Sequence, residues 1–304
     1  MKTLSYEREG KRLHSYLRSI GFKDLNNRNE IELLIKDIIK HPDKKIITED
    51  EQGNVFAELT REFSEFTGIA VRGFYMDDEF HVEYYYPYFT GSGVSTEERV
   101  DIQKRSDREA YAGVCDEMRI GVTLIFYLQN AVEYLQEQRT KNGRRMPINT
   151  TISALSASGK IILPVYKNEN QIKSGEKYTI NRNHLMAAAR DGDEDAMESL
   201  TLEDIDTYSM ISRRIMTEDI LSIVDTYFMP YGIESDQYSI MGEILDFYTI
   251  ENKKTKEKSY VLTLNSNHLV FDICINQDDL LGEPAAGRRF KGTIWMQGHI
   301  NYQM

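Results

Sequence analysis

The chain has 304 residues, of which 40% are hydrophobic and 28% are charged. This composition is typical of a globular protein and argues against extensive disorder. The 49 acidic and 37 basic residues give a net charge of -12. A field of that sign repels phosphate backbones and anionic lipid surfaces, so tight binding to duplex nucleic acid is not expected.

Two further features concern the cellular compartment. The chain has no run of about 18 apolar residues, so no membrane span is expected, and its first ten residues lack the apolar core of a secretory signal. Cys115 and Cys274 are the only cysteines, and each lies in an apolar segment. This pattern predicts reduced, buried thiols in a soluble, cytoplasmic protein.

The first elements expected along the chain are helices. Residues 13–22 and 29–40 repeat apolar residues at spacings of three and four, which predicts two amphipathic helices. Gly21 is expected to end the first helix. From residue 55 to residue 89 the chain is rich in β-branched and aromatic residues, which predicts strands. Within it, residues 67–76 and 80–88 are expected to form a hairpin.

The next segment mixes both patterns. Residues 96–108 are polar and are expected to be helical or irregular, whereas residues 120–128 are apolar and predict a buried strand. Residues 130–138 predict a helix. Residues 148–155 and 160–166 predict a second hairpin that turns at Ser158 and Gly159. We therefore expect helices packed on a mainly antiparallel sheet in residues 1–175.

A helical middle segment is expected in residues 176–237. Its apolar residues repeat with helical spacing, and Asp193 and Thr201 are the expected N-caps. Thr217, followed by two acids, is expected to begin a further helix.

Residues 238–304 are again predicted to form strands, and they make up the third expected domain. The segments 238–250, 259–265, 269–275 and 287–301 predict four strands. Their order suggests a small β-barrel-like module of the OB type, although that fold needs five strands. Trp295 is expected to be buried within it. The overall expectation is an α+β protein with domains at 1–175, 176–237 and 238–304.

No catalytic or metal-binding motif is present. Phosphate-binding loops, dinucleotide-binding glycine patterns, zinc-protease motifs and nucleophile elbows are all missing. The acidic run 191–206 fails as a calcium loop, because Ala196 stands where glycine is needed and Leu202 where a carboxylate is needed. His268 and Cys274 alone do not make a zinc site. We therefore predict no catalytic residue, no metal site and no cofactor.

The basic residues of the last domain fall into two groups. Lys253, Lys254, Lys256 and Lys258 lie in one predicted loop, and Arg288, Arg289 and Lys291 open the last strand. In an OB-like module such loops can bind a single-stranded nucleic acid or another polyanion. A solvated loop is the favoured interpretation, because residues 238–304 contain eight acids against seven bases and are not basic overall.

Several stretches of the chain resemble a bacterial family known as domain of unknown function 3881. They are GVTLIFYLQN at 121–130, LSASGKIILP at 155–164, DIDTYSMISRR at 204–214, YFMPYGIESDQY at 227–238 and GRRFKGTIWMQG at 287–298. The resemblance implies a bacterial cytosolic protein. It supplies no catalytic residue, ligand or partner.

Three hypotheses for the function follow from these patterns. The leading one is a non-enzymatic binding or regulatory protein whose ligand is a protein or a small molecule. The second is single-strand nucleic-acid or polyanion binding through the C-terminal module. The third is an enzyme of a class without a sequence motif, using scattered carboxylates such as Glu83 or Asp116.

Overall fold

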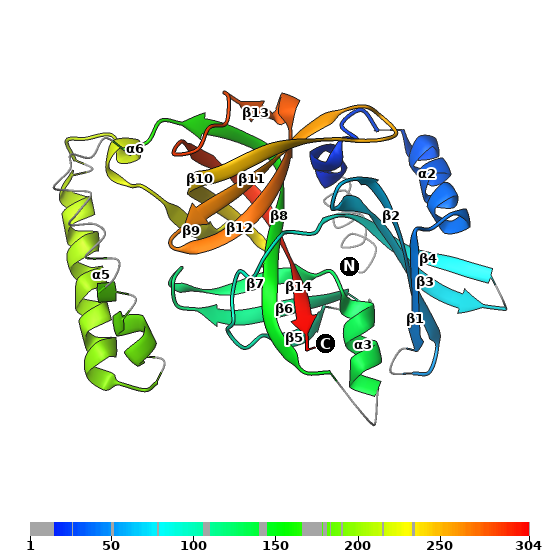
Figure 1. The fold of residues 1–304 in the computed structure, drawn as a ribbon, viewed down its shortest axis with the longest axis horizontal. Coiled ribbons are helices and arrows are strands. Elements are labelled where there is room, and N and C mark those ends of the chain that lie inside the picture. Colours follow the sequence, from blue (N-terminus) through cyan, green and yellow to red (C-terminus); the bar gives the residue numbers. More distant parts are fainter. Residues whose placement is uncertain are drawn as a thin grey trace. The chain divides into compact units, whose positions relative to one another are not determined.

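The computed structural model describes residues 15–303 apart from 26, 50–51, 78, 106–109, 140–144, 166–177, 179–180, 183, 190, 215 and 233–234. The chain divides into two compact units, which are described separately (Figure 1). The first comprises Met1–Ile162 and Phe228–Met304, and the second comprises Leu163–Tyr227. The α+β class with a largely antiparallel strand arrangement is confirmed. The expected domain limits at 175 and 237 stay a prediction.

One antiparallel sheet, here called sheet A, lies in the N-terminal part of the first unit. Its strands pair in chain order: β1 (Lys44–Glu49), β2 (Val55–Ser64), β3 (Thr67–Met76) and β4 (Glu79–Phe89). The predicted hairpin is therefore confirmed as β3 and β4. The register places Glu58 of β2 opposite Arg72 of β3, and Arg72 opposite Tyr84 of β4. Three polar side chains thus line up across the sheet.

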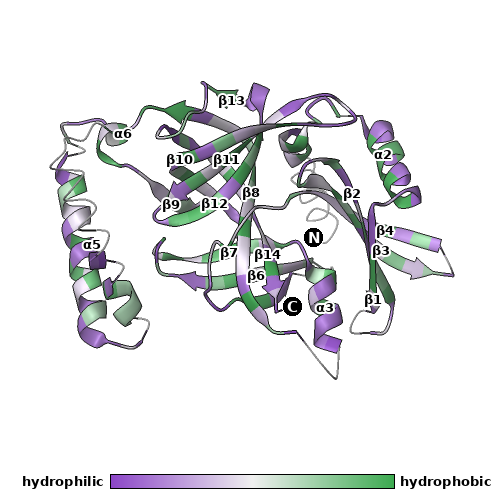
Figure 2. Cartoon of the chain, viewed as in Figure 1, coloured by the Kyte–Doolittle hydropathy of each residue, from purple (hydrophilic) through white to green (hydrophobic). Residues whose placement is uncertain are grey.

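Two helical elements flank sheet A. The second predicted helix is confirmed as α2 (Arg28–Lys40), where Asn27 accepts a bond from the Asn29 N–H as N-cap. Hydrophobic and hydrophilic residues alternate around α2 (Figure 2), and its buried side chains are Leu34, Ile35 and Ile38. The described part of the first predicted helix contains the 3-10 helix η1 (Tyr16–Ile20), and its expected residues 13 and 14 lie outside the described residues. Gly21 ends η1 in the left-handed conformation at φ 83°.

A second, mixed sheet, here called sheet B, contains the other paired strands of the described residues. These are β5 (Asp101–Arg105), β6 (Ala110–Glu117), β7 (Val122–Leu128), β8 (Pro147–Ile162), β9 (Tyr227–Pro230), β10 (Gln237–Glu251), β11 (Lys258–Ser266), β12 (Leu269–Asn276), β13 (Leu280–Leu281) and β14 (Arg289–Tyr302). The helix α3 (Ala131–Arg139) follows β7, as expected, and η2 (Gln277–Asp279) precedes β13. Helical or irregular structure was expected for residues 96–108. This expectation is wrong for Asp101–Arg105, because the backbone of β5 pairs with β6.

Within sheet B, five of the described strands pair in a ring. β10, β11 and β12 are antiparallel neighbours, and β12 lies parallel to β8. β8 then pairs antiparallel with β14, which pairs antiparallel with β10. The series of pairings thus returns to its first strand. Outside the ring, β7 pairs with β14, β6 pairs with β7, and β5 pairs with β6.

The predicted hairpin at Ser158 and Gly159 is wrong, because β8 continues through it as one strand. Gly159 and Lys160 pair with Gly292 and Lys291 of β14. A Cβ at Gly159 would lie only 2.3 Å from the ring of Phe290. Gly159 therefore does not form a turn. It lets the ring of Phe290 pack directly against the backbone of β8.

One of the two hydrophobic clusters among the described residues of the first unit includes Trp295 on β14. This side chain is fully buried, as expected, and its ring lies 5.4 Å from that of Tyr16 and 5.3 Å from that of Tyr127. Its indole N–H donates to Asp236 at 2.9 Å. Asp236 also pairs with Arg105 at 2.6 Å, so the carboxylate that accepts the indole N–H has a charged partner.

The second unit is helical where it is described. Its main element is α5 (Glu194–Arg214), followed by α6 (Ile220–Ile223). Asp193 accepts a bond from the Ala196 N–H, which confirms the predicted N-cap. Thr201 lies inside α5 and bonds back to the carbonyl of Met197, so its expected role as an N-cap is wrong. No helix of the described ranges is long and apolar enough to cross a membrane.

Candidate functional site

The most unusual group of the first unit is a buried arginine, Arg72. It lies on β3 in an otherwise apolar stretch and is fully buried. Its Nε donates to Glu58 at 2.5 Å, and Nη1 donates to the hydroxyls of Tyr84 and Tyr127, both at 3.0 Å. Nη2 donates to the hydroxyl of Tyr86 at 2.9 Å and to the carbonyl of Gln129 at 2.7 Å. Each of the five N–H groups of the guanidinium therefore has an acceptor.

The charge of Arg72 is balanced by Glu58, which is 5% exposed. Burial is the largest single influence and would lower the pKa of Arg72, but Glu58, Tyr127, Tyr84 and Tyr86 together outweigh it and hold that pKa well above its ordinary value. Burial raises the pKa of Tyr86 well above its ordinary value, so the phenol keeps its proton and donates to Glu58 at 3.0 Å. The carboxylate is thereby fixed by two donors, both on Oε2.

A second buried polar network joins the two sheets beside this pair. Gln129, which follows β7, donates to the carbonyl of Phe89 and to Gln297, both at 2.8 Å. Gln297 donates to the carbonyl of Pro87 at 2.9 Å. Because Pro87 and Phe89 belong to β4 and Gln297 to β14, the bonds fasten sheet A to sheet B. They fix the space between the two sheets.

That space contains a polar cavity of about 510 Å³, here called the inter-sheet cavity. Side chains at alternate positions of β2 and β4 form one wall, as the two-residue repeat of a strand requires. The opposite wall comes from the segment after β7, α3, β14 and the loop between β10 and β11. The lining residues are Asp43, Lys44, Ile46, Glu58, Thr60, Glu62, Tyr86, Tyr88, Thr90, Gln129, Asn130, Glu133, Lys253 and His299.

The lining carries charges of both signs. Glu58 is held by Arg72, Glu133 pairs with Arg145 at 2.9 Å, and Asp43 accepts a bond from the Glu62 N–H. The side chains of Glu62, Lys44 and Lys253 are exposed at the edge of the cavity. The cavity therefore has the fixed carboxylate of Glu58 in its wall. The carboxylate of Glu62 and the amines of Lys44 and Lys253 lie at its edge.

His299 of β14 adds a neutral group to the inter-sheet cavity. Burial lowers its pKa, and nearby Lys44 acts in the same direction, while Glu133 and Glu58 oppose it. The pKa of His299 is lowered overall. At neutral pH the imidazole is therefore uncharged and can both donate and accept a hydrogen bond.

We expect His299 to make the protein less stable in mild acid. Because its pKa is lower in the folded chain, the unfolded chain binds the proton more readily, and stability falls as the pH drops below about 6.5. Urea denaturation at pH 7.5 and pH 5.5 measures this loss. The His299→Gln variant should lose less stability on acidification than the wild type. His81→Gln, at an exposed position, should behave as wild type, and identical losses in all three would contradict the assignment.

The structure places the predicted basic loop against η1 and β2. Asn252 donates to the carbonyl of Ile20 at 2.8 Å, and Thr255 donates to that of Gly21 at 2.6 Å. The Lys253 N–H donates to the carbonyl of Phe63 at 2.6 Å. The loop is therefore fixed at its base. It directs Lys253 to the inter-sheet cavity and Lys254 to a separate groove beside α2.

The other predicted basic residues are not gathered at one place. Lys256 pairs with Glu251 at 3.7 Å, and Lys258 begins β11 opposite Glu251. Arg289 lies opposite Glu243 of β10, eight positions from Glu251, which is about 26 Å along a strand. The lysine loop and the group Arg288, Arg289 and Lys291 thus lie at separate places along β10. Arg289 is itself buried. Polyanion binding by these residues stays a prediction.

Both cysteines are buried thiols, as the sequence predicted. Burial raises the pKa of Cys115 to about 12 and raises that of Cys274 as well. The thiol of Cys274 lies 3.2 Å from the carbonyl of Ser19, in the core. Among the described residues, no three His, Cys, Asp or Glu side chains are grouped so that they could hold a metal ion.

Slow thiol chemistry is the expected consequence. A thiol-specific chromogenic reagent at pH 8 should label neither cysteine of the native protein within minutes, because the thiolate is the reacting species. Both cysteines should react after unfolding in urea. Rapid labelling of the native protein would contradict the burial of the thiol concerned.

The sequence analysis did not identify the Arg72 network. The signal that it passed over was a single arginine within an apolar strand, with a glutamate in the preceding strand at a matching position. Glu58 and Arg72 are direct cross-strand partners. Recognising them requires the register of β2 and β3, which sequence spacing alone does not supply.

One family model matches the chain over nearly its whole length. Its description reads "Domain of unknown function, E. rectale Gene description (DUF3881)", and it covers residues 17–298. No curated protein and no solved structure matches the chain. The resemblance found in the sequence is confirmed, whereas a bacterial, cytoplasmic origin stays a prediction. The chain belongs to the family known as domain of unknown function 3881.

Proposed function

We propose that the protein is a non-enzymatic binding protein whose ligand is a small zwitterionic molecule held in the inter-sheet cavity. The observation that carries this proposal is the carboxylate of Glu58, fixed beside the cavity by the buried Arg72. A charged group held rigidly by buried partners does not have to be ordered when a ligand binds, which favours recognition.

The size and chemistry of the cavity support a small polar ligand. Its volume of about 510 Å³ lies within the range of about 300–1,000 Å³ that is usual for ligand pockets. Glu58 and Glu62 suit a protonated amine, whereas Lys44 and Lys253 suit a carboxylate. A zwitterion can contact groups of both signs at once, whereas a ligand of one sign can contact only one set favourably.

A thermal-shift panel tests this function. Free amino acids are compared with their amides and with their deaminated acids, each at millimolar concentration. We expect one or more zwitterions to raise the melting temperature of the wild type and the matched analogues to raise it less. Glu62→Gln should reduce the shift. Glu65 is an exposed carboxylate that follows β2 and does not line the cavity, so Glu65→Gln should leave the shift unchanged. Equal shifts with zwitterions and deaminated acids would overturn the proposal.

A second candidate function follows from the ring of strands in sheet B. We propose that β8, β10, β11, β12 and β14 form a small OB-like barrel, with β8 as the fifth strand that residues 238–304 lack. Support comes from one parallel pair, β8 and β12, in a ring of otherwise antiparallel pairs. In such a barrel the loop between β10 and β11 corresponds to a ligand-binding loop. This loop carries Lys253, Lys254 and Lys256.

The second candidate predicts single-strand binding that depends on this loop. The probe is a fluorescein-labelled thymidine oligonucleotide, followed by fluorescence anisotropy at several salt concentrations. Substituting Lys253, Lys254, Lys256 and Lys258 by glutamine should abolish micromolar binding and its salt dependence. If the wild type does not bind more tightly than about 10 μM, the second candidate fails and the inter-sheet cavity remains.

A further inference from the structure

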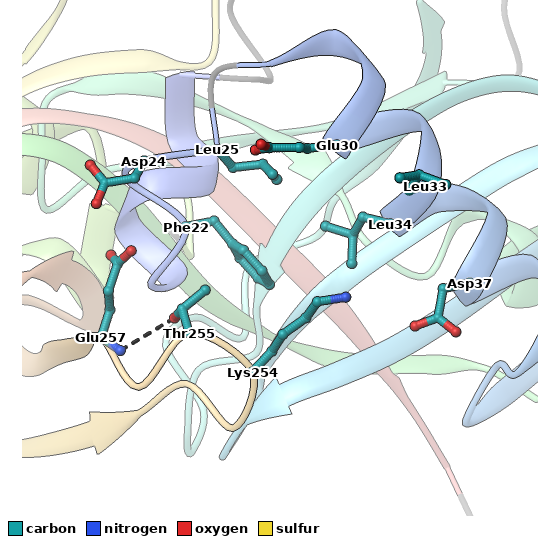
Figure 3. Close-up of a pocket in the computed structure, with 10 residues that line it drawn as sticks. All are labelled: Phe22, Asp24, Leu25, Glu30, Leu33, Leu34, Asp37, Lys254, Thr255 and Glu257. Atoms are coloured by element: carbon teal, nitrogen blue, oxygen red, sulfur yellow. Dashed lines mark hydrogen bonds between the residues drawn. The ribbon is translucent and has the colours of Figure 1, made fainter.

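A second cavity, of about 450 Å³, lies between α2 and the loop that joins β10 to β11. Phe22, Leu25 and Leu34 face one another in its middle, and Leu33 lies at its edge (Figure 3). Phe22 and Leu34 are buried, whereas Leu33 is 66% exposed. We call this feature the α2 groove. It shares no lining residue with the inter-sheet cavity.

The walls of the α2 groove are fixed by contacts on both sides. The ring of Phe22 packs edge-on against Phe63, with ring centres 5.0 Å apart. On the other side, the loop with Lys254 is held by the bonds of Asn252 and Thr255 to the end of η1. A preformed groove binds a partner without first having to order its own walls.

Carboxylates surround this apolar floor. Asp24, Glu30, Asp37 and Glu257 line the groove, against the single amine of Lys254. Asp37 pairs with Arg61 at 2.8 Å, and Glu257 accepts a bond from the side chain of Asn276, also at 2.8 Å. Asp24 and Glu30 are exposed. Two carboxylates at the open edge are therefore placed to contact an incoming cation.

We propose that the α2 groove docks a segment of a partner protein that presents a large apolar side chain next to a lysine or arginine. The apolar side chain would lie against Phe22, Leu33 and Leu34, and its basic neighbour would reach Asp24 or Glu30. Charge complementarity supports this occupant, because acids outnumber bases four to one around the groove. The net charge of -12 adds long-range attraction for a basic segment. An acidic or phosphorylated segment is disfavoured by the same field.

Binding of a model peptide tests the docking site. The probe is a fluorescein-labelled twelve-residue peptide of repeated Arg-Leu-Leu-Arg units, and its match replaces every arginine by glutamate. We expect the basic peptide to bind the wild type and the acidic peptide not to bind. The double variant Glu30→Lys with Leu33→Ser should weaken binding about tenfold or more. Both side chains are exposed, so folding is not at risk.

A matched control separates the groove from the net charge. Glu32→Lys changes the charge by the same amount on the same helix, at an exposed position that does not line the groove. It should leave binding within about twofold of wild type. Two-dimensional NMR should place the peptide-induced shifts at Phe22, Leu33 and Leu34.

Three results would overturn the proposal. If Glu32→Lys and Glu30→Lys weakened peptide binding equally, the peptide would respond only to the net charge of the protein. Tighter peptide binding after deletion of residues 1–14 would assign the groove to the chain's own first residues. Self-association that the Glu30→Lys and Leu33→Ser variant abolishes would assign it to a second copy. None of these results bears on the inter-sheet cavity, so the two proposals can fail independently.

Discussion

Replacing Arg72 by methionine is expected to destabilise the protein by about 3–5 kcal/mol. The substitution removes five donors at once and leaves Glu58 as a buried charge without its counter-ion. It also removes one donor from each of the hydroxyls of Tyr84, Tyr86 and Tyr127. Urea denaturation measures the loss. The fluorescence of Trp295 reports it, because this residue is the only tryptophan and lies against Tyr127.

An exposed ion pair provides the control for this experiment. Arg61 of β2 pairs with Asp37, and both side chains are partly exposed, at 30% and 40%. Arg61→Met should therefore cost less than about 1 kcal/mol. If Arg72→Met and Arg61→Met destabilised the protein equally, the buried network would not hold sheet A to sheet B, and the inter-sheet cavity would lose its fixed wall.

Replacing Trp295 by alanine is expected to cost about 3–5 kcal/mol. The indole is fully buried between Tyr16 and Tyr127, and its N–H bonds to Asp236. Truncation leaves a large cavity in the core and removes one donor from Asp236, although Arg105 remains as a partner. Circular dichroism during urea unfolding measures the change.

Two further variants make the Trp295 result interpretable. Trp295→Phe keeps most of the ring volume and should cost clearly less than the alanine variant. Tyr208→Ala removes an aromatic ring that is 75% exposed on α5 and should change stability by no more than about 0.5 kcal/mol. A loss for Trp295→Ala as small as that for Tyr208→Ala would contradict the position of Trp295 in the core.

Periodicity predicted the local elements that depend on neighbouring residues. The repeats of α2, the hairpin of β3 and β4, the apolar run of β7 and the four strands after residue 237 all match the structure. The errors arose where tertiary contacts override local signals. Ser158 and Gly159 have the composition of a turn, but β8 runs straight through them because the Phe290 ring packs against Gly159.

The candidate site could not be predicted to the same extent, because its residues are far apart in the chain. The sequence grouped the lysines of the β10–β11 loop by their proximity, and folding directs Lys253 and Lys254 to different cavities. Glu58 and His299 are far apart in the sequence, and folding places both in the lining of the inter-sheet cavity. Charge and spacing identify exposed groups, whereas a buried pair depends on strand register and on the packing of two sheets.

Ligand binding in the inter-sheet cavity can be checked by a crystal structure of the protein with the zwitterion that gives the largest thermal shift. We expect the compound to lie in the inter-sheet cavity, with its amine toward Glu58 and its carboxylate toward Lys44 or Lys253. Arg72 should keep its five bonds when the ligand is bound. A ligand found outside this cavity, or an amine directed away from Glu58, would contradict zwitterion binding between the two sheets.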